Sequence, residues 1–304
     1  MTITTRAVLQ IEQDGPLTVD ALRLPDPGPN QVIVRMVASG VCNSQIFWMH
    51  QPRQHGMLFG HEGYGVVAQT GRDVPGLREG DHVIVTWLPR MAGVTRAPDV
   101  PIFDLPGGRT AKAPNVFTWA DHALVDELYV RKVPDRAHQD VVSVIGCAVI
   151  TGAGAVLNTG AVRKGETVAV IGMGGVGLSA IAAASVAGAG RVIAVDLRDA
   201  KLDLARKFGA TDVVNGSNSD PVVAIHALLP GRCGCGAGAD MALDCVGLTQ
   251  TTLQALGATR AGRLGQERGG RCVVVGVPKK PLEFDLFGMM AAEKTMLGSM
   301  AGSC

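Results

Sequence analysis

The chain has 304 residues, of which 47% are hydrophobic, and its charged side chains leave a formal net charge of +1. This length and hydrophobic content are sufficient for two domains with separate cores, and the balanced charge argues against a nucleic-acid or strongly acidic partner. The seven cysteines are odd in number and widely scattered, which argues against a secreted disulfide scaffold. With no apparent signal peptide, a cytoplasmic protein is expected.

Residues 1–145 are predicted to form the first domain. The sequence to about Pro134 is rich in valine and is punctuated by glycine, proline and aspartate, which predicts short strands joined by turns. Between Trp87 and Val116 no clear periodicity is visible. This stretch is predicted to be a long loop or lobe that borders the active site.

Residues 146–304 are predicted to form the second domain. Alanine-rich helical segments alternate with Val/Ile-rich strands, which is typical of a doubly wound parallel sheet. The boundary falls in a helical segment from Val141 to Val162. Two charge-free stretches, 141–162 and 167–190, are long enough to span a bilayer, but both are interrupted by glycines and neither is predicted to be a membrane helix. The expected strands are Val168 to Ile171, Val192 to Val195, Val213 to Asn215, Met241 to Asp244 and Cys272 to Val275.

A glycine-rich turn follows the first of these strands and predicts a dinucleotide site. Gly172 ends the strand, Gly174 permits close approach of a pyrophosphate, and Gly177 lets the following helix pack against the sheet, with Gly175 and Val176 between them. About 20 residues further on, Asp196 ends the next strand and is placed to accept hydrogen bonds from the adenosine ribose. Its charge favours NAD over NADP, although Arg198 offers a partner for a 2′-phosphate.

Three candidate ligands for a soft metal lie far apart in the sequence: Cys42, His61 and Cys147. Two thiolates and one imidazole make an open zinc site, since catalytic zinc keeps three protein ligands and leaves a fourth position for water or substrate. The alternative is that the cysteines are buried core thiols and that the histidine is structural.

Five segments together resemble the zinc-dependent alcohol dehydrogenase family of the medium-chain dehydrogenases/reductases. The resemblance runs from near residue 40 to the end of the chain. It implies a β-rich catalytic domain of GroES type followed by a Rossmann domain. The matching segments are Gly40-Val-Cys-Asn-Ser44, Gly60-His-Glu-Gly-Tyr-Gly65, the segment from Gly146 to Ala155, the glycine-rich turn with Asp196, and Val275-Gly-Val-Pro278.

The resemblance also implies roles for individual residues. Cys42, His61 and Cys147 would bind the catalytic zinc, Ser44 would pass a proton beside the open position, and Glu62 would support the metal or bind it transiently. Alternatives remain for two of them, because Ser44 could cap a helix and Glu62 could be a buried ion-pair partner. The residues implied at the cofactor are Thr151, Gly276 and Val277 beside the nicotinamide and Lys201 at the ribose.

The sequence departs from the family pattern in several places. Gln45 stands where many relatives have an aspartate that hydrogen-bonds the zinc-binding histidine. An amide can still accept that hydrogen bond, but it makes the imidazole less basic than a carboxylate does. A weaker zinc site is therefore predicted. Phe47 replaces the histidine of the proton relay. The stretch from Trp87 to Val116 has no cysteine, so one catalytic and no structural zinc is expected, and Cys233 and Cys235 are not expected to bind a second metal.

The segment in which relatives return to the catalytic domain is expected to be missing after the last Rossmann strand, which would expose part of the core or indicate a fragment.

The sequence therefore predicts an oxidoreductase that transfers a hydride between NAD(H) and a small alcohol, aldehyde or ketone. Two alternatives stay open: a zinc-free quinone or enone reductase of the same superfamily, and a truncated, non-catalytic dinucleotide-binding protein. The final strand near Thr295 to Ser299 matches the element that pairs across a two-fold axis in the family, which predicts a homodimer or homotetramer.

Overall fold

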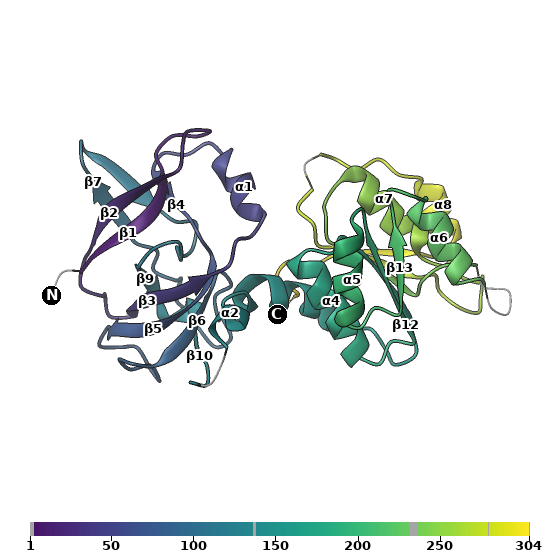
Figure 1. Cartoon of the computed structure of the whole chain (residues 1–304), viewed down its shortest axis with the longest axis horizontal. Coiled ribbons are helices and arrows are strands. Elements are labelled where there is room, and N and C mark those ends of the chain that lie inside the picture. The colour runs from purple at the N-terminus through teal and green to yellow at the C-terminus, as the bar shows by residue number, and fades with distance from the viewer. Residues whose placement is uncertain (1–2, 136–137, 232–235, 279, 304) are drawn as a thin grey trace. The chain divides into compact units, whose positions relative to one another are not determined.

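The computed structural model describes residues 3–135, 138–231, 236–278 and 280–303. They form two compact units, Met1–Cys147 and Ala148–Cys304, shown in Figure 1. The strands of the first unit are β1 (Ile3–Gln10), β2 (Thr18–Leu24), β3 (Gln31–Ser39), β4 (Gly56–Leu58), β5 (Glu62–Thr70), β6 (His82–Thr86), β7 (Ile102–Leu105), β8 (Arg109–Lys112), β9 (His122–Asp126) and β10 (Val130–Lys132). Its helical turns include α1 (Ser44–Met49), η1 (Glu127–Tyr129) and α2 (Gln139–Val142).

The first unit is built from two five-stranded sheets, in the orders β2-β1-β4-β8-β7 and β10-β6-β5-β3-β9. Side chains from both sheets share one core, in which Leu24, Val34, Val85 and Phe117 are almost completely buried. The valine-rich strands form because branched side chains pack well on a pleated surface, and the turns between them carry the glycine, proline and aspartate punctuation seen in the sequence.

The long loop or lobe predicted from Trp87 to Val116 contains regular structure that was not predicted. Strands β7 and β8 form an antiparallel hairpin within it. Phe103 and Leu105 are buried while the residues between and before them are exposed, and the Phe103 ring packs edge-on against Phe117. The alternation was present in the sequence, but only four residues carry it and glycine- and proline-rich turns surround it, so it gives no clear period.

The second unit is a six-stranded sheet in the order β13-β12-β11-β14-β15-β16, and every neighbouring pair is parallel. Its strands are β11 (Thr167–Ile171), β12 (Arg191–Asp196), β13 (Asp212–Asn215), β14 (Met241–Asp244), β15 (Arg271–Val274) and β16 (Thr295–Gly298). Its helices are α3 (Ile150–Gly154), α4 (Gly175–Val186), α5 (Asp199–Lys207), α6 (Pro221–Leu228), α7 (Thr249–Ala258) and α8 (Leu286–Ala291); π-helical turns occur at η2 (Ile145–Val149) and η3 (Ala155–Thr159).

Both faces of this sheet are buried, which explains the nearly continuous apolar strands. In β11, Val168 and Val170 pack in the cluster that includes residues of α4 and α5, whereas Ala169 and Ile171 pack in the cluster on the opposite face with residues of α6 and α7. Figure 1 shows these helix pairs on the two sides of the sheet. Strand order reverses between β11 and β14, and ligands of such sheets bind outside the carboxyl ends of the strands at that point. No helix among the described residues is long and apolar enough to cross a membrane.

Candidate functional site

The pairing of β3 with β5 brings Cys42 and His61 together. These strands are antiparallel, and Ser39 near the end of β3 lies opposite Gly63 near the start of β5. Cys42 follows β3 and His61 precedes β5. The two connecting loops are tied at the Glu62 carbonyl oxygen, which accepts hydrogen bonds from the Ser39 hydroxyl at 2.8 Å and from the Gly40 N–H at 3.2 Å.

Cys147 reaches the same place from η2. Thr86 lies opposite Glu62 in the β5–β6 ladder, and its hydroxyl donates a hydrogen bond to the Gly146 carbonyl at 2.6 Å. A Cβ at Gly146 would lie only 2.6 Å from the Val85 carbonyl oxygen. The absence of a side chain at Gly146 therefore permits the close approach that positions Cys147.

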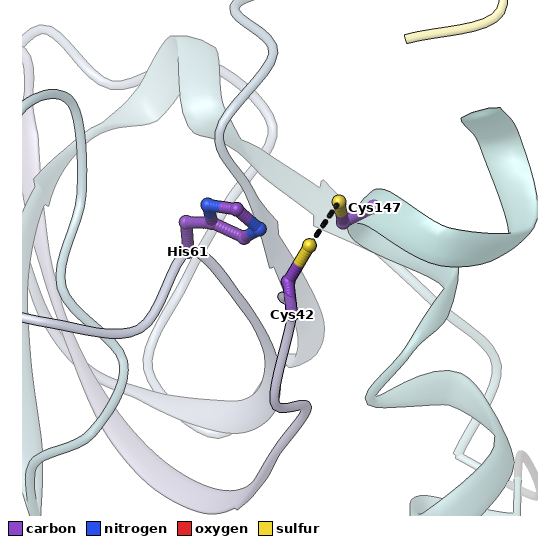
Figure 2. Close-up of side chains that lie close together, drawn as sticks. All are labelled: Cys42, His61 and Cys147. Carbon is purple, nitrogen blue, oxygen red and sulfur yellow. Dashed lines mark hydrogen bonds between the residues drawn. The ribbon is translucent and has the colours of Figure 1, made fainter. Parts of the chain in front are cut away.

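The three predicted metal ligands converge in the structure. A ligand atom of each of Cys42, His61 and Cys147 lies within 4.8 Å of the other two, and Figure 2 shows both sulfurs beside the imidazole. The sulfurs are 3.8 Å apart, which is close to the separation of about 3.8 Å expected for two thiolates bound at about 2.3 Å to a tetrahedral zinc ion. The buried Nε2 of His61 has no hydrogen-bond partner among the described residues, so no other side chain there competes with a metal ion for this atom.

Hydrogen bonding makes the two thiols unequal. The pKa of the Cys42 thiol is lowered to about 3, chiefly because its thiolate accepts a hydrogen bond from Cys147, and also because it lies beside the His61 ring and accepts a bond from Ser44. The pKa of Cys147 is raised by its hydrogen bond to Cys42, by burial and by the nearby charge of Glu62. By contrast, Cys272 lies in the core of the second unit, where burial raises its pKa to about 12. Cys42 is therefore the most reactive of these three thiols.

Ser44 and Glu62 both lie beside this cluster. Ser44 is the first residue of α1, after the N-cap residue Asn43, and its hydroxyl donates to the Cys42 sulfur at 3.2 Å. The helix-cap alternative for Ser44 is therefore not observed. Glu62 is buried, and its carboxylate lies so close to the Gly40 backbone that a Cβ there would be 2.5 Å from Oε1.

Gln45 contacts His61, but not in the expected sense. Its amide nitrogen lies 2.9 Å from Nδ1 of His61, while its Oε1 accepts a hydrogen bond from the Gly60 N–H at 2.9 Å. The prediction that the Gln45 amide accepts a hydrogen bond from His61 is thus wrong, because the amide oxygen already accepts the Gly60 N–H. Trp87 was not predicted at this site, yet its ring centroid lies 6.1 Å from that of His61. Its place directly after β6 was the available signal.

The glycine-rich turn of the second unit has the features of a phosphate-binding turn. Gly172 has φ +95°, and a Cβ at Gly177 would lie 1.8 Å from the Gly172 carbonyl oxygen, so α4 can cross β11 only without a side chain there. Gly174, the N-cap residue of α4, has no side-chain cap, and a Cβ on it would meet no atom within 4 Å. Open space therefore lies next to the helix N-terminus, where anions are stabilised.

Asp196 lies beside this turn. Its carboxylate accepts hydrogen bonds from the backbone N–H groups of Met173 at 2.9 Å, Leu197 at 2.8 Å and Arg198 at 3.1 Å. The Lys201 ammonium lies 3.5 Å from Asp196 Oδ2. A carboxylate has about four acceptor sites, so the three backbone bonds leave one of them, on Oδ2.

The remaining predicted cofactor residues lie on two further segments of the second unit. A Cβ at Gly152 would be 2.1 Å from the Val176 carbonyl oxygen. This close approach means that α3, which carries Thr151, packs against the start of α4. The Thr151 hydroxyl is buried and has no hydrogen-bond partner among the described residues. Gly276 packs directly on the backbone at Gly247, and Val277, which follows it, is exposed.

Comparisons with known proteins match this architecture over most of the chain. The model of the alcohol dehydrogenase GroES-like domain matches residues 28–135, and that of zinc-binding dehydrogenases matches residues 175–303. Alcohol dehydrogenase class-3 of Cereibacter sphaeroides is 32% identical over 90% of this chain and 78% of its own length. The S-(hydroxymethyl)glutathione dehydrogenase of a Synechocystis strain is 30% identical, again over 90% of this chain and 78% of its own length.

The chain belongs to the zinc-type alcohol dehydrogenase family. The resemblance inferred from the sequence motifs is thereby confirmed.

Solved structures of this family agree with the fold. An alcohol dehydrogenase zinc-binding domain protein from Burkholderia ambifaria superposes with a TM-score of 0.84 at 30% identity, covering 99% of this chain and 85% of that one. Benzyl alcohol dehydrogenase from Acinetobacter calcoaceticus gives a TM-score of 0.83 at 28% identity over the same shares. The prediction of a GroES-like β-rich domain and a Rossmann sheet is confirmed, and the chain is an oxidoreductase of this family.

Proposed function

We propose that this oxidoreductase uses NAD(H) and one zinc ion to interconvert small alcohols with aldehydes or ketones. The convergence of Cys42, His61 and Cys147 carries the proposal. Thiolate and imidazole are the donors that catalytic zinc selects, and three protein donors leave its fourth position open. The family membership and the names of its relatives support the reaction class.

In this proposal His61 binds the metal through Nε2, while Cys42 and Cys147 bind it as thiolates. When bound, the zinc supplies a Lewis acid for an alkoxide or carbonyl oxygen, and the nicotinamide carries the hydride. The Ser44 hydroxyl, now directed at the Cys42 sulfur, would exchange a proton with the substrate oxygen. Because the Phe47 side chain cannot carry a proton, the proton would pass from Ser44 to water. Glu62 supports the centre from its buried position beside Gly40.

We assign the nucleotide to the turn of the second unit. The pyrophosphate fits the open space beside Gly174, and the carboxylate of Asp196 favours a ribose with a free 2′-hydroxyl, hence NAD over NADP. Lys201, paired with Asp196, is assigned to the same ribose. The nicotinamide is assigned to the backbone of Gly276 and Val277 and to Thr151, whose buried hydroxyl has no partner among the described residues.

We further propose that residues 1–145 are the catalytic domain and residues 146–304 the nucleotide-binding domain, and that the protein works in the cytoplasm as a homodimer or homotetramer. Strand β16 supports the assembly, because it forms an edge of the sheet among the described strands and exposed edges favour pairing.

The deciding experiment measures zinc per chain by elemental analysis, NADH binding by fluorescence, and oxidation of an alcohol panel that includes benzyl alcohol and S-(hydroxymethyl)glutathione. The chain and its Cys42→Ala variant are compared, with Cys272→Ala as the matched control. About one zinc per chain, lost only in Cys42→Ala while NADH still binds, is expected. A zinc-free chain that binds NADH and reduces quinones or enones would replace the proposal with the zinc-free alternative.

A further inference from the structure

The Gln45 side chain is held between a backbone donor and a ring nitrogen. It is 5% exposed. Its Oε1 accepts the Gly60 N–H, and its Nε2 lies against His61 Nδ1, both at 2.9 Å. An amide has distinct ends, one that only accepts and one that only donates. The orientation of Gln45 therefore decides what His61 meets at Nδ1.

The backbone fixes that orientation because the Gly60 peptide cannot turn away. Gly60 has φ +86°, and a Cβ there would be 2.5 Å from Thr118 Oγ1 and from the Trp119 backbone nitrogen. The carbonyls of Phe59 and Gly60 both accept the Thr118 N–H at 3.1 Å. Because the Gly60 N–H points at Gln45, a reversed amide would place the Gln45 NH₂ group against that N–H. Two buried donors would then face each other without an acceptor, which is unfavourable. The amide oxygen therefore faces Gly60 and the amide nitrogen faces His61.

A donor at Nδ1 determines where a neutral imidazole keeps its proton. A neutral imidazole has one N–H and one lone pair, and the Gln45 N–H requires the lone pair at Nδ1. The proton is then on Nε2, the nitrogen that is buried without a partner among the described residues. A metal needs a lone pair at Nε2 and a proton on Nδ1, commonly held by an acceptor.

We infer that Gln45 is a positioning residue that holds His61 in the tautomer unable to bind a metal, and so weakens metal loading. This inference rests on the proposed function, in which His61 is a ligand. Metal binding at His61 requires a proton on Nδ1, and there are two ways to accommodate it. If the Gln45 amide keeps its orientation, the new Nδ1–H faces the Gln45 N–H. If the amide reverses, its NH₂ group faces the Gly60 N–H. Each route replaces one hydrogen bond by a donor–donor contact. A carboxylate in place of the amide accepts from both neighbours and removes the conflict.

The first test is independent of metal. The zinc-free chain is labelled with ¹⁵N at its histidines, and NMR detects which His61 nitrogen carries the proton at a pH where the ring is neutral; His61→Gln identifies the signal. The proton is expected on Nε2 in the wild-type chain and on Nδ1 in Gln45→Glu, which keeps the length of the side chain. A wild-type chain with the proton mainly on Nδ1 would overturn the inference.

The second test measures zinc affinity by competition with a coloured chelator. Gln45→Glu is expected to tighten zinc binding about 10- to 100-fold, the usual effect of a hydrogen-bond partner of a metal ligand. Ile46→Glu is the matched control, since it adds the same charge at an exposed position one residue further along α1. Equal tightening in both variants, or none in Gln45→Glu, would contradict the inference. Full zinc binding by Cys42→Ala would instead contradict the proposed metal site.

Discussion

The two candidate sites are built from different parts of the chain. In the first unit, side chains from Cys42, His61 and Cys147 converge although they are far apart in the sequence. In the second unit, a contiguous turn from Gly172 to Gly177 forms the site largely with backbone, and its glycines are needed because a Cβ would collide or fill the open space. A backbone site is damaged by adding atoms, whereas a side-chain site is damaged by removing donors. Substitutions that add a single methyl group or a branched side chain therefore test this difference.

The largest effect is expected for Gly177→Val. Its Cβ would lie 1.8 Å from the Gly172 carbonyl oxygen, so α4 must move away from β11. Overpacking of this kind costs about 3 kcal/mol of the free energy of unfolding, and NADH binding should be lost in fluorescence titrations while zinc per chain is unchanged.

Gly174→Ala is the matched control for the same turn. Its Cβ meets no protein atom within 4 Å, and its backbone is extended at φ −88°, so the thermal midpoint should change little. NADH affinity should still fall about tenfold, because the methyl group occupies space assigned to the pyrophosphate. NADH binding by Gly177→Val at the wild-type affinity would show that this close packing is not required.

The second prediction extends the comparison to a glycine of the first unit. Gly146→Ala places a Cβ 2.6 Å from the Val85 carbonyl oxygen and so displaces Cys147 without removing a ligand. Zinc affinity, measured by chelator competition, should fall about tenfold or more. Thr86→Val removes the hydrogen bond to the Gly146 carbonyl, together with the one that the hydroxyl accepts from the Leu88 N–H, and should have a smaller effect. Wild-type zinc affinity in Gly146→Ala would mean that Cys147 does not depend on this backbone approach.

These differences explain what could be predicted from the sequence. The turn was predictable because strand, glycines and Asp196 follow one another at short range, so each role is local. The metal cluster depends on the register of β3 with β5 and on the approach of Gly146 to β6, neither of which local sequence determines. Only the match to family motifs selected Cys42 and Cys147 from among the seven cysteines.

The orientation of the Gln45 amide was beyond sequence analysis for a related reason. It is fixed by Gly60, a residue 15 positions away, and by the packing of Gly60 on Thr118. The hairpin of β7 and β8 was missed because its strands are too short for a clear period. Long-range contacts thus determine the details of the first unit.

The third prediction concerns the choice between nucleotides. Asp196→Ala removes the carboxylate assigned to the ribose, and hydrogen bonds to charged groups contribute about 1.5–3 kcal/mol. NADH affinity should therefore fall about tenfold or more while NADPH affinity falls less, as fluorescence titrations can measure. Asp199→Ala, which removes a carboxylate from the first turn of α5, is the control. An equal loss for both nucleotides would indicate that Asp196 serves only its three backbone donors.

The smallest expected effect concerns acid stability of the second unit. The hydrogen bond from Arg191 lowers the pKa of Asp212, so folding stabilises the ionised carboxylate. This contribution is present above the pKa of about 3.9 of an unfolded aspartate and is lost as the pH falls through the lower pKa of the folded chain. Since the pair is partly exposed, it contributes about 1 kcal/mol or less. Asp212→Asn should lower stability at neutral pH and make it less dependent on pH between 5 and 2, as followed by thermal unfolding. A parallel decrease at every pH would assign the loss to packing instead of charge, and the ion pair would then contribute nothing specific to the β12–β13 edge of the sheet.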